Sequence, residues 1–287
     1  MPWVRAHERS AMNGLRLNLG CGAEGHPAFV NVDIAAGPGI VRHDLRQGVP
    51  FPDATYDLVY HSTMLSMLRP SEALSFMREC RRVLKPGGVL RVVTEDLEQM
   101  CRVYLEKLEA AYAGDKQSEK DYEWMILELY DQATRDSAGG QMARYLSEDP
   151  LPNEAFIYAR VGEQGRRMVS GARSRAATVG QSSRAARSLP RRLRAAVRKV
   201  ILTAVLGADG LNAFEMGRFR QSSGQVSYRM YDRYSLRQLF LNAGLSGISL
   251  RSPTESAYSC WNDLNLDVSS EGHVARPHAL IMEGIRA

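Results

Sequence analysis

The chain has 287 residues, of which 44% are hydrophobic and 24% charged, and this is the composition of an ordinary folded protein. No apolar run approaches the roughly 20 residues that a membrane-spanning helix needs, and the N-terminal sequence lacks the apolar core of a signal peptide. The four cysteines have no paired spacing, so neither a zinc site nor a disulfide framework is indicated. We therefore expect a cytoplasmic protein.

The net charge of +5 is unevenly distributed along the chain. Residues 164–208 contain eleven Arg and Lys and no Asp or Glu. The rest of the chain has 26 basic and 32 acidic residues, which is a net charge of −6. We therefore expect a mildly acidic body that carries one concentrated basic element.

Residues 15–34 contain two strand-like runs joined by a glycine turn. The first run ends at Gly20-Cys21-Gly22, and the second closes on Asp33. Such glycines let a ligand lie against bare backbone, and an acid at the tip of the next strand can accept hydrogen bonds from a ribose diol. Together they indicate a nucleotide-type cofactor on a doubly wound sheet.

The following residues continue an alternation of strands with helices or turns. Residues 40–45 and 56–61 are strand-like, and Pro70-Ser71 is suited to begin a helix. That helix is expected to end at residues 85–88, before a fifth strand at residues 89–94. This alternation is typical of a parallel sheet that binds ligands at the carboxyl ends of its strands.

The pattern changes after residue 95. Apolar residues at helical spacing predict helices over residues 96–113 and 119–135. The apolar face of the second helix consists of Tyr122, Met125, Ile126, Leu129 and Tyr130. After a Gly/Ser/Pro-rich connection, residues 189–206 combine an apolar stripe with basic residues mostly off it, which predicts a basic amphipathic helix.

The sheet pattern resumes at residue 231. Residues 234–240 begin a helix with a serine cap that ends near Gly244, and residues 248–251 and 278–284 are strand-like. The chain is therefore expected to contain a cofactor-binding half at residues 1–95, a helical insertion or cap at 96–230, and a completion of the sheet at 231–287.

Several of these segments resemble a known family, the class I S-adenosylmethionine-dependent methyltransferases, and within it the type 11 group. Residues 18–22 are similar to the family's glycine motif, and Asp33 stands where its ribose-binding acid stands. Residues 51–60 and 78–90 are similar to the signatures of its fourth and fifth strands. The resemblance implies an α/β fold with a Rossmann-like, doubly wound, seven-stranded sheet, an antiparallel last strand and a helical insertion between strands five and six. It also implies S-adenosyl-L-methionine as the cofactor.

The resemblance further implies which residues hold the cofactor. Gly20 and Gly22 would give backbone access to its methionine and ribose parts, and Asp33 would hold the ribose hydroxyls. Asp44 would flank the adenine, and His61 would approach the methionine end. A solvated acid, a helix cap and a structural histidine are the alternatives for these three side chains. The complete expected set is Asn18, Gly20, Cys21, Gly22, Asp33, Ile34, Asp44, Leu45 and His61.

Two features depart from the family's pattern. Asn18 stands where relatives commonly carry Asp or Glu, so a charge that helps to orient the methionine ammonium is absent. After the fourth strand, relatives often have two histidines and a glutamate, whereas this chain has Thr63, Ser66 and Met67. No catalytic role is therefore carried over to residues 62–68.

Tyr231 and two acids remain candidates for a catalytic base. Methyl transfer from a sulfonium needs alignment and a dry pocket, and a hydroxyl acceptor sometimes also needs a base. Asp96 follows the fifth strand, and Asp232 lies beside Tyr231 where the chain returns from the insertion. The alternatives are a helix N-terminus for Asp96 and an aromatic hinge around Tyr231.

The C-terminal third resembles a bacterial subgroup associated with glycan assembly, through residues 230–236, 252–256 and 261–267. This implies O-methylation of a sugar or glycan-like acceptor by in-line transfer. Trp261 and Asn262 are residue types that line sugar sites, and core packing is their alternative. Two other functions stay open: a tailoring methyltransferase for a small natural product, and a non-catalytic protein of this fold that binds a membrane or a partner.

The basic segment at residues 164–208 has three interpretations. It could dock on an anionic membrane surface through the helix at 189–206, cover an acidic acceptor, or pack by its apolar stripe within a solvated insertion. Nucleic acid is disfavoured because the segment contains no aromatic residue for stacking. Peripheral membrane attachment therefore stays open, and the sequence does not indicate an oligomeric state.

Overall fold

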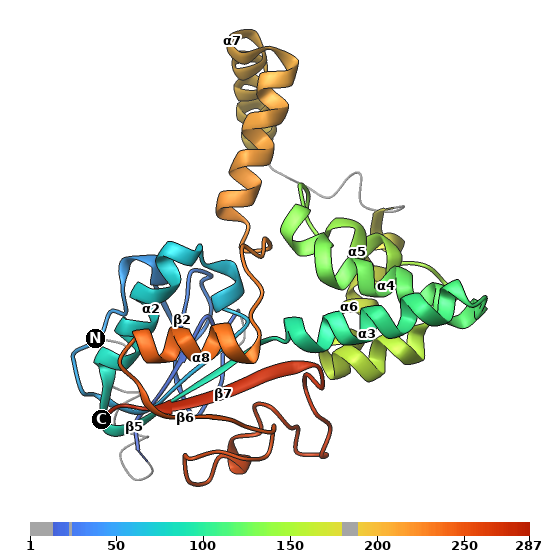
Figure 1. The fold of residues 1–287 in the computed structure, drawn as a ribbon. Coiled ribbons are helices and arrows are strands. Elements are labelled where there is room, and N and C mark those ends of the chain that lie inside the picture. Colours follow the sequence, from blue (N-terminus) through green and yellow to red (C-terminus); the bar gives the residue numbers. More distant parts are fainter. Residues whose placement is uncertain (1–13, 23–24, 180–188) are drawn as a thin grey trace. The chain divides into compact units, whose positions relative to one another are not determined.

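The computed structural model describes residues 14–22, 25–179 and 189–287 (Figure 1). The chain divides into two compact units. The first contains the residues up to Glu106 together with Ala159–Glu163 and Ser227–Ala287. The second contains Lys107–Tyr158 and Gln164–Val226.

The first unit is built on a seven-stranded sheet in the order β3-β2-β1-β4-β5-β7-β6. The strands are β1 (Arg16–Leu19), β2 (Val30–Asp33), β3 (Ile40–Arg42), β4 (Tyr56–Ser62), β5 (Leu84–Glu95), β6 (Ser246–Leu250) and β7 (Ala279–Ile285). Strands β1 to β5 are parallel, and β7 is antiparallel to both of its neighbours, β5 and β6. The expected seven-stranded Rossmann-like sheet with an antiparallel last strand is confirmed.

Helices α2 (Pro70–Val83) and α8 (Arg233–Asn242) pack on one face of this sheet (Figure 1). Phe76 and Met77 of α2 and Phe240 of α8 lie in the larger core with side chains from the strands. The predicted serine cap of α8 is wrong by three residues. Asp232 caps the helix by accepting from the backbone N–H of Ser235 at 2.7 Å, and the Ser235 hydroxyl accepts from the Asp232 N–H at 3.1 Å.

An irregular segment, residues 251–278, covers the opposite face of the sheet. Within the described residues, this segment contains no helix longer than the short 3-10 helix Asn262–Leu264. Trp261 and Leu264 of this segment pack on Leu58 of β4 and on Val89 and Val93 of β5. Trp261 is 4% exposed, and its Nε1–H donates to the carbonyl of Pro253 at 3.0 Å. The core-packing alternative therefore applies to Trp261.

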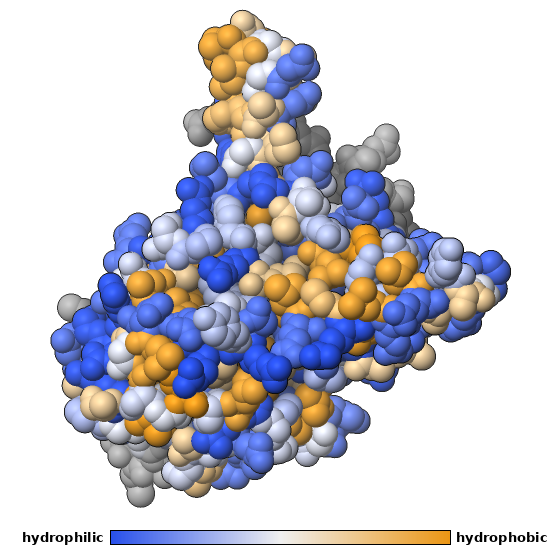
Figure 2. Space-filling model, viewed as in Figure 1, coloured by the Kyte–Doolittle hydropathy of each residue, from blue (hydrophilic) through white to orange (hydrophobic). Residues whose placement is uncertain are grey.

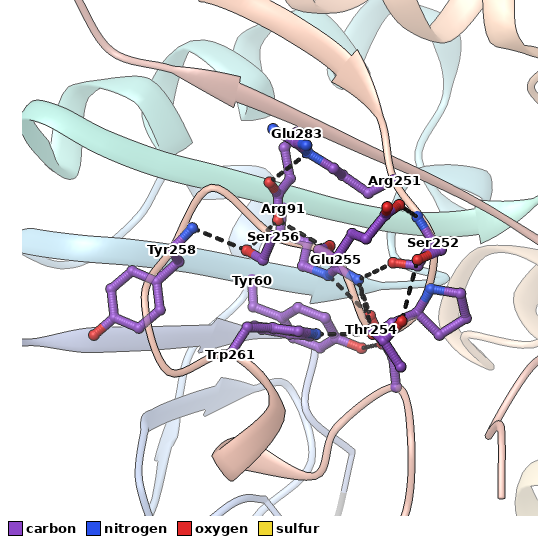
Figure 3. Close-up of polar contacts among 12 residues, drawn as sticks. Tyr60, Arg91, Arg251, Ser252, Thr254, Glu255, Ser256, Tyr258, Trp261 and Glu283 are labelled. Atoms are coloured by element: carbon purple, nitrogen blue, oxygen red, sulfur yellow. Dashed lines mark hydrogen bonds and ion pairs between the residues drawn. The ribbon is translucent and has the colours of Figure 1, made fainter. Parts of the chain in front are cut away.

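A fully buried arginine on β5 holds this segment against the sheet (Figure 3). The Arg91 guanidinium donates to Asp267 at 2.9 Å and to Glu283 at 2.7 Å, and it stacks on Trp261 at 4.2 Å. It also donates to the carbonyls of Ser252 and Glu255. Burial raises the pKa of Asp267, while Arg91 opposes the shift. One side chain thus joins β5 and β7 to the segment that covers them.

The second unit is helical and contains α4 (Lys116–Thr134) and α5 (Gly140–Tyr145). Two further helices, α3 (Leu97–Tyr112) and α6 (Glu154–Val179), each contain residues of both units. The predicted apolar face of α4 is confirmed for Met125, which is buried, but Tyr130 is exposed and three acids are buried: Asp121, Glu128 and Asp131. Each buried acid has a partner. Glu128 accepts from Trp124 Nε1–H at 2.5 Å, Asp131 pairs with Arg135, and Asp121 pairs with Lys107.

Helix α7 (Leu189–Ser222) continues beyond the predicted basic helix. Gly207 adopts φ 71° and ψ 175°, and it divides α7 into two helical segments. The part Val200–Ser222 is long and apolar enough, by length and composition alone, to cross a membrane, and it is the one such helix in the described chain. By length and composition, one segment thus reaches the range that no segment was expected to approach, but Gly207 divides it.

Candidate functional site

Five parallel strands end at one edge of the sheet, and the loops that follow them form the candidate site. Strands β1 to β5 end at Leu19, Asp33, Arg42, Ser62 and Glu95. Parallel neighbours in register bring these ends together, and ligands of open α/β sheets bind at such an edge. The expected cofactor residues all lie at or just beyond these strand ends.

The glycine turn after β1 is tied to the tip of β2. The Gly20 N–H donates to the Val32 carbonyl at 2.8 Å, and the Gly22 N–H donates to Asp33 Oδ2 at 2.8 Å. Asp33 Oδ1 accepts from the Ala35 N–H at 2.7 Å. A carboxylate offers about four acceptor positions, so Asp33 can brace the turn and still accept from two hydroxyl groups.

Both glycines of the turn adopt positive φ, 70° at Gly20 and 73° at Gly22. A Cβ on Gly20 would lie 3.1 Å from Met64 Sδ, whereas a Cβ on Gly22 would meet nothing within 4 Å. Gly20 therefore allows the chain after β4 to close on the turn, and Gly22 leaves open space beside bare backbone. That space is what a ligand in van der Waals contact with the turn requires.

Cys21 and Asn18 contact other residues of the protein around the glycine turn. Burial and the charge of Asp33 raise the pKa of the Cys21 thiol to about 11, so the thiol stays neutral. Asn18 is buried and donates to Asn31 Oδ1 at 3.2 Å, and Asn31 exchanges two hydrogen bonds with the backbone of His26. Sequence reasoning missed Asn31, whose side chain fixes the loop after the glycine turn.

Ile34 of the expected cofactor set, and Asp44 and Leu45, which were expected to flank the adenine, differ in exposure. Ile34 follows Asp33 directly and is 58% exposed, which leaves an apolar surface beside the acid. Asp44 caps the short 3-10 helix Leu45–Gln47 and pairs with Arg46 at 2.8 Å. Hydrogen bonds from Arg46 hold the pKa of Asp44 below its usual range. Leu45 lies in the core. Asp44 acts as a helix cap, which was the alternative to cofactor contact. Of the three, Ile34 has the exposed side chain that a ligand could contact.

His61 lies inside the core, against Phe76, with 0% of its surface exposed. Neither ring nitrogen has a hydrogen-bond partner, and burial lowers the pKa of the imidazole to about 3. The geometry favours the structural alternative for His61. The ring of His61 faces the core, so only the backbone of His61 is available at the end of β4.

This burial predicts an acid-dependent loss of stability that His61→Leu removes. The unfolded chain binds a proton at this histidine near pH 6.5 and the folded protein only near pH 3, so stability is lost as the pH falls below 6.5. At pH 5 the loss is about 2 kcal/mol. Urea unfolding at pH 7 and pH 5 should show a smaller acid loss for His61→Leu than for the unchanged protein. The exposed control His273→Asn should keep the full loss, and equal losses in all three proteins would contradict the prediction.

The segment after β4 forms a turn that supports the returning chain. Thr63 adopts φ 56°, a strained conformation for a β-branched residue. Ser66 is buried, its hydroxyl donates to the Thr63 carbonyl, and its own carbonyl accepts from the Tyr228 N–H at 2.7 Å. Residues 63–66 thus form a packed turn. The positive φ of Thr63 could not be predicted from the sequence.

The two candidate acids lie together at the end of β5. Asp96 forms a parallel bridge with Tyr231, the residue before Asp232. Asp96 Oδ1 accepts from the Gln99 N–H at 3.1 Å, as a helix N-terminus would predict. Asp232 caps α8, and the backbone hydrogen bond from Ser235 lowers the pKa of Asp232, which makes it a weak base. Both acids therefore cap a helix, but Asp232 forms a reciprocal capping box with Ser235, whereas Asp96 accepts a single capping hydrogen bond, so Asp96 is the less committed of the two.

Two exposed arginines, which the sequence analysis did not single out, flank this edge. Arg69 stacks on the ring of Tyr228 at 5.6 Å, and Arg229 stacks on the ring of Tyr231 at 5.2 Å. Both guanidinium groups keep donors for a ligand that carries hydroxyl or carboxylate oxygens.

Residues 21–92 match a protein family described as a methyltransferase domain. The match covers about a quarter of the chain and includes β2, β3 and β4 completely. None of the curated proteins matches the chain.

Solved structures with a similar fold include several methyltransferases. One, from Thermotoga maritima, is described as a possible histamine N-methyltransferase; it is 9% identical, with 99% of this chain and 93% of that chain covered and a TM-score of 0.39. The 1,6-didemethyltoxoflavin-N1-methyltransferase of Burkholderia thailandensis, with bound S-adenosylhomocysteine, is 14% identical, with 33% and 51% covered and a TM-score of 0.27. A Pyrococcus horikoshii protein is 24% identical, with 38% and 62% covered and a TM-score of 0.28. The chain thus spans about half the length of the Burkholderia protein.

Proposed function

We propose that this chain, whose residues 21–92 match a methyltransferase domain, is an enzyme that transfers a methyl group from S-adenosyl-L-methionine. The observation that carries the proposal is the glycine turn, which is open at Gly22 and braced by Asp33. The residues present fit the cofactor. Gly22 would lie against it, Asp33 would accept from the ribose hydroxyls, and the exposed Ile34 would pack on the adenine.

The cofactor, when bound, supplies a methyl group already activated as a sulfonium. The chain's own residues then have three tasks: to hold the acceptor in line with the methyl carbon, to exclude water, and to take up a proton from a hydroxyl acceptor. Asp96 is the group proposed for the proton, because Asp232 exchanges two hydrogen bonds with Ser235 and its pKa is lowered by them, whereas Asp96 accepts one capping hydrogen bond.

For the acceptor we propose a hydroxyl group of a sugar or glycan-like compound. The resemblance of the C-terminal third to a glycan-associated subgroup supports this acceptor, and so do the exposed arginines Arg69 and Arg229 at the strand ends. Trp261 offers no support, because its indole is buried beneath Arg91. The proposal therefore rests on polar groups that can bind hydroxyl oxygens.

Asp96→Asn should lower kcat about 10²-fold and leave cofactor affinity unchanged, because the amide keeps the hydrogen bond to Gln99 but takes up no proton. Transfer is measured as S-adenosylhomocysteine formed with monosaccharides, oligosaccharides or small amines as acceptors. Affinity is measured by calorimetric titration with S-adenosylmethionine.

The matched control is Asp232→Asn, since asparagine is also a good helix cap and should leave kcat within about twofold. A loss of kcat in Asp232→Asn but not in Asp96→Asn would reverse the assignment of the base. Methylation of amines but not sugars would refute the acceptor. No binding of either S-adenosylmethionine or S-adenosylhomocysteine would refute the proposed function.

A further inference from the structure

We propose that helix α7 docks on an anionic lipid surface and inserts its apolar side chains at the interface. The proposal concerns α7 of the second unit and does not depend on methyl transfer. It rests on two independent properties of this helix, its exposed apolar residues and the sign of the charge beside them.

Large apolar side chains are exposed on both sides of Gly207. They are Val197, Val200, Ile201, Val205 and Leu206 before the glycine, and Phe214 and Met216 after it. The spacing of Val197, Ile201 and Val205 puts them on one face of a helical turn, and Val205 is 75% exposed. Figure 2 shows hydrophobic residues over the outer end of α7. Exposed apolar residues gathered in this way mark a surface that contacts another apolar phase.

Before Gly207, the charge in the sequence of α7 is of one sign. In the sequence, the basic residues of α7 before Gly207 are Arg191, Arg192, Arg194, Arg198 and Lys199. The first acids after the glycine are Asp209 and Glu215. Anionic headgroups complement such a segment, since each Lys or Arg near an anionic membrane adds to the attraction. The α7 helix of a second copy would present the same positive charge and be repelled. The charge therefore disfavours self-association through paired α7 helices.

The geometry of α7 favours a position in the interface over a span of the bilayer. Gly207 interrupts the helix, so residues 208–222 form a segment of only about 22 Å, shorter than the roughly 30 Å hydrocarbon core. The segment before Gly207 carries the basic residues, which favour the headgroup region. Exposed apolar residues around the glycine, preceded in the sequence by basic residues, are the pattern of an interfacial anchor.

The test is co-sedimentation of the full chain with vesicles of phosphatidylcholine, with and without phosphatidylglycerol. We expect binding to the anionic vesicles only, and a decrease when salt is raised. Each neutralised cation should lower the partition about fivefold, so Arg198→Gln with Lys199→Gln should lower it about 25-fold. Val200→Ser with Val205→Ser should lower it by a similar factor, because both side chains are exposed and contribute only in the lipid.

The matched control is Leu241→Ser with Leu250→Ser, two exposed apolar residues of the first unit that should leave partitioning unchanged. Equal binding to neutral and anionic vesicles, no binding to either, or an unchanged partition in both α7 variants would overturn the proposal. So would a vesicle-free dimer in analytical ultracentrifugation that Val200→Ser with Val205→Ser abolishes, since it would assign the apolar face to a second copy.

Discussion

Arg91→Met should lower the free energy of unfolding by about 3–5 kcal/mol, because it removes one partner from a buried ion network. Asp267 and Glu283 are 6% and 1% exposed, and the variant leaves both without the guanidinium that accompanies them. The carbonyls of Ser252 and Glu255 lose a donor as well. Urea unfolding at pH 7 measures the change.

The loss should shrink at acid pH. Burial raises the pKa of Asp267 and Arg91 opposes that shift, so in Arg91→Met the pKa rises further. An acid with a raised folded-state pKa destabilises the protein as the pH rises through that pKa, and protonation removes the penalty. The control Arg102→Met breaks an exposed pair with Glu98 and should change stability by at most about 0.5 kcal/mol. A change of that size in Arg91→Met would contradict the assigned role.

Asp33→Ala should weaken the binding of S-adenosylmethionine by about 10²-fold. Each hydrogen bond from a hydroxyl to a carboxylate contributes about 1.5–3 kcal/mol, and partial exposure of Asp33 places the pair at the lower end. The variant also frees the Gly22 N–H, which loosens the turn. Calorimetric titration with S-adenosylmethionine and S-adenosylhomocysteine measures both affinities.

The control for this variant is Asp53→Ala. Asp53 is 70% exposed and pairs with Arg82. It precedes β4 and so lies at the edge of the sheet opposite the candidate site. Its removal should leave the cofactor affinity within about twofold. Equal affinities for Asp33→Ala and Asp53→Ala would remove Asp33 from the site and leave the glycine turn without its ribose partner.

The strands of the sheet could be predicted from the sequence because each is a short apolar run bounded by glycine, proline or an acid. The runs before Gly20 and Asp33 are buried strands in the structure. The number of strands and the antiparallel last strand also followed from the resemblance of these runs to a known fold. Each of these sequence signals is local, because it lies within about ten residues of the strand that it predicts.

The features that could not be predicted depend on distant partners. Arg91 stands in a run of apolar residues on β5, and its acids lie 176 and 192 residues later in the chain. The cover of the second face by residues 251–278 depends on this contact and has no periodicity of its own. Helix α4 shows the same limitation, because its buried acids meet partners such as Lys107 that hydrophobic spacing does not reveal.

At the candidate site, the backbone features were more predictable than the side-chain roles. The glycine turn and Asp33 lie where the motif predicts, at neighbouring strand ends. His61 was harder, because the alternation along β4 decides which face its ring occupies, and the ring faces the α2 core. Asp232 was also hard to assign, because Ser235 stands three residues later and the two residues form the cap of α8.

The bridge between Asp96 and Tyr231 joins the two ends of a long excursion of the chain. The chain leaves the sheet at one of these residues and re-enters it at the other. An excursion whose ends already touch can be lengthened, shortened or replaced with little change in the entropy of closing the loop. During divergence, this segment can therefore be exchanged while the strands of the sheet stay as they are.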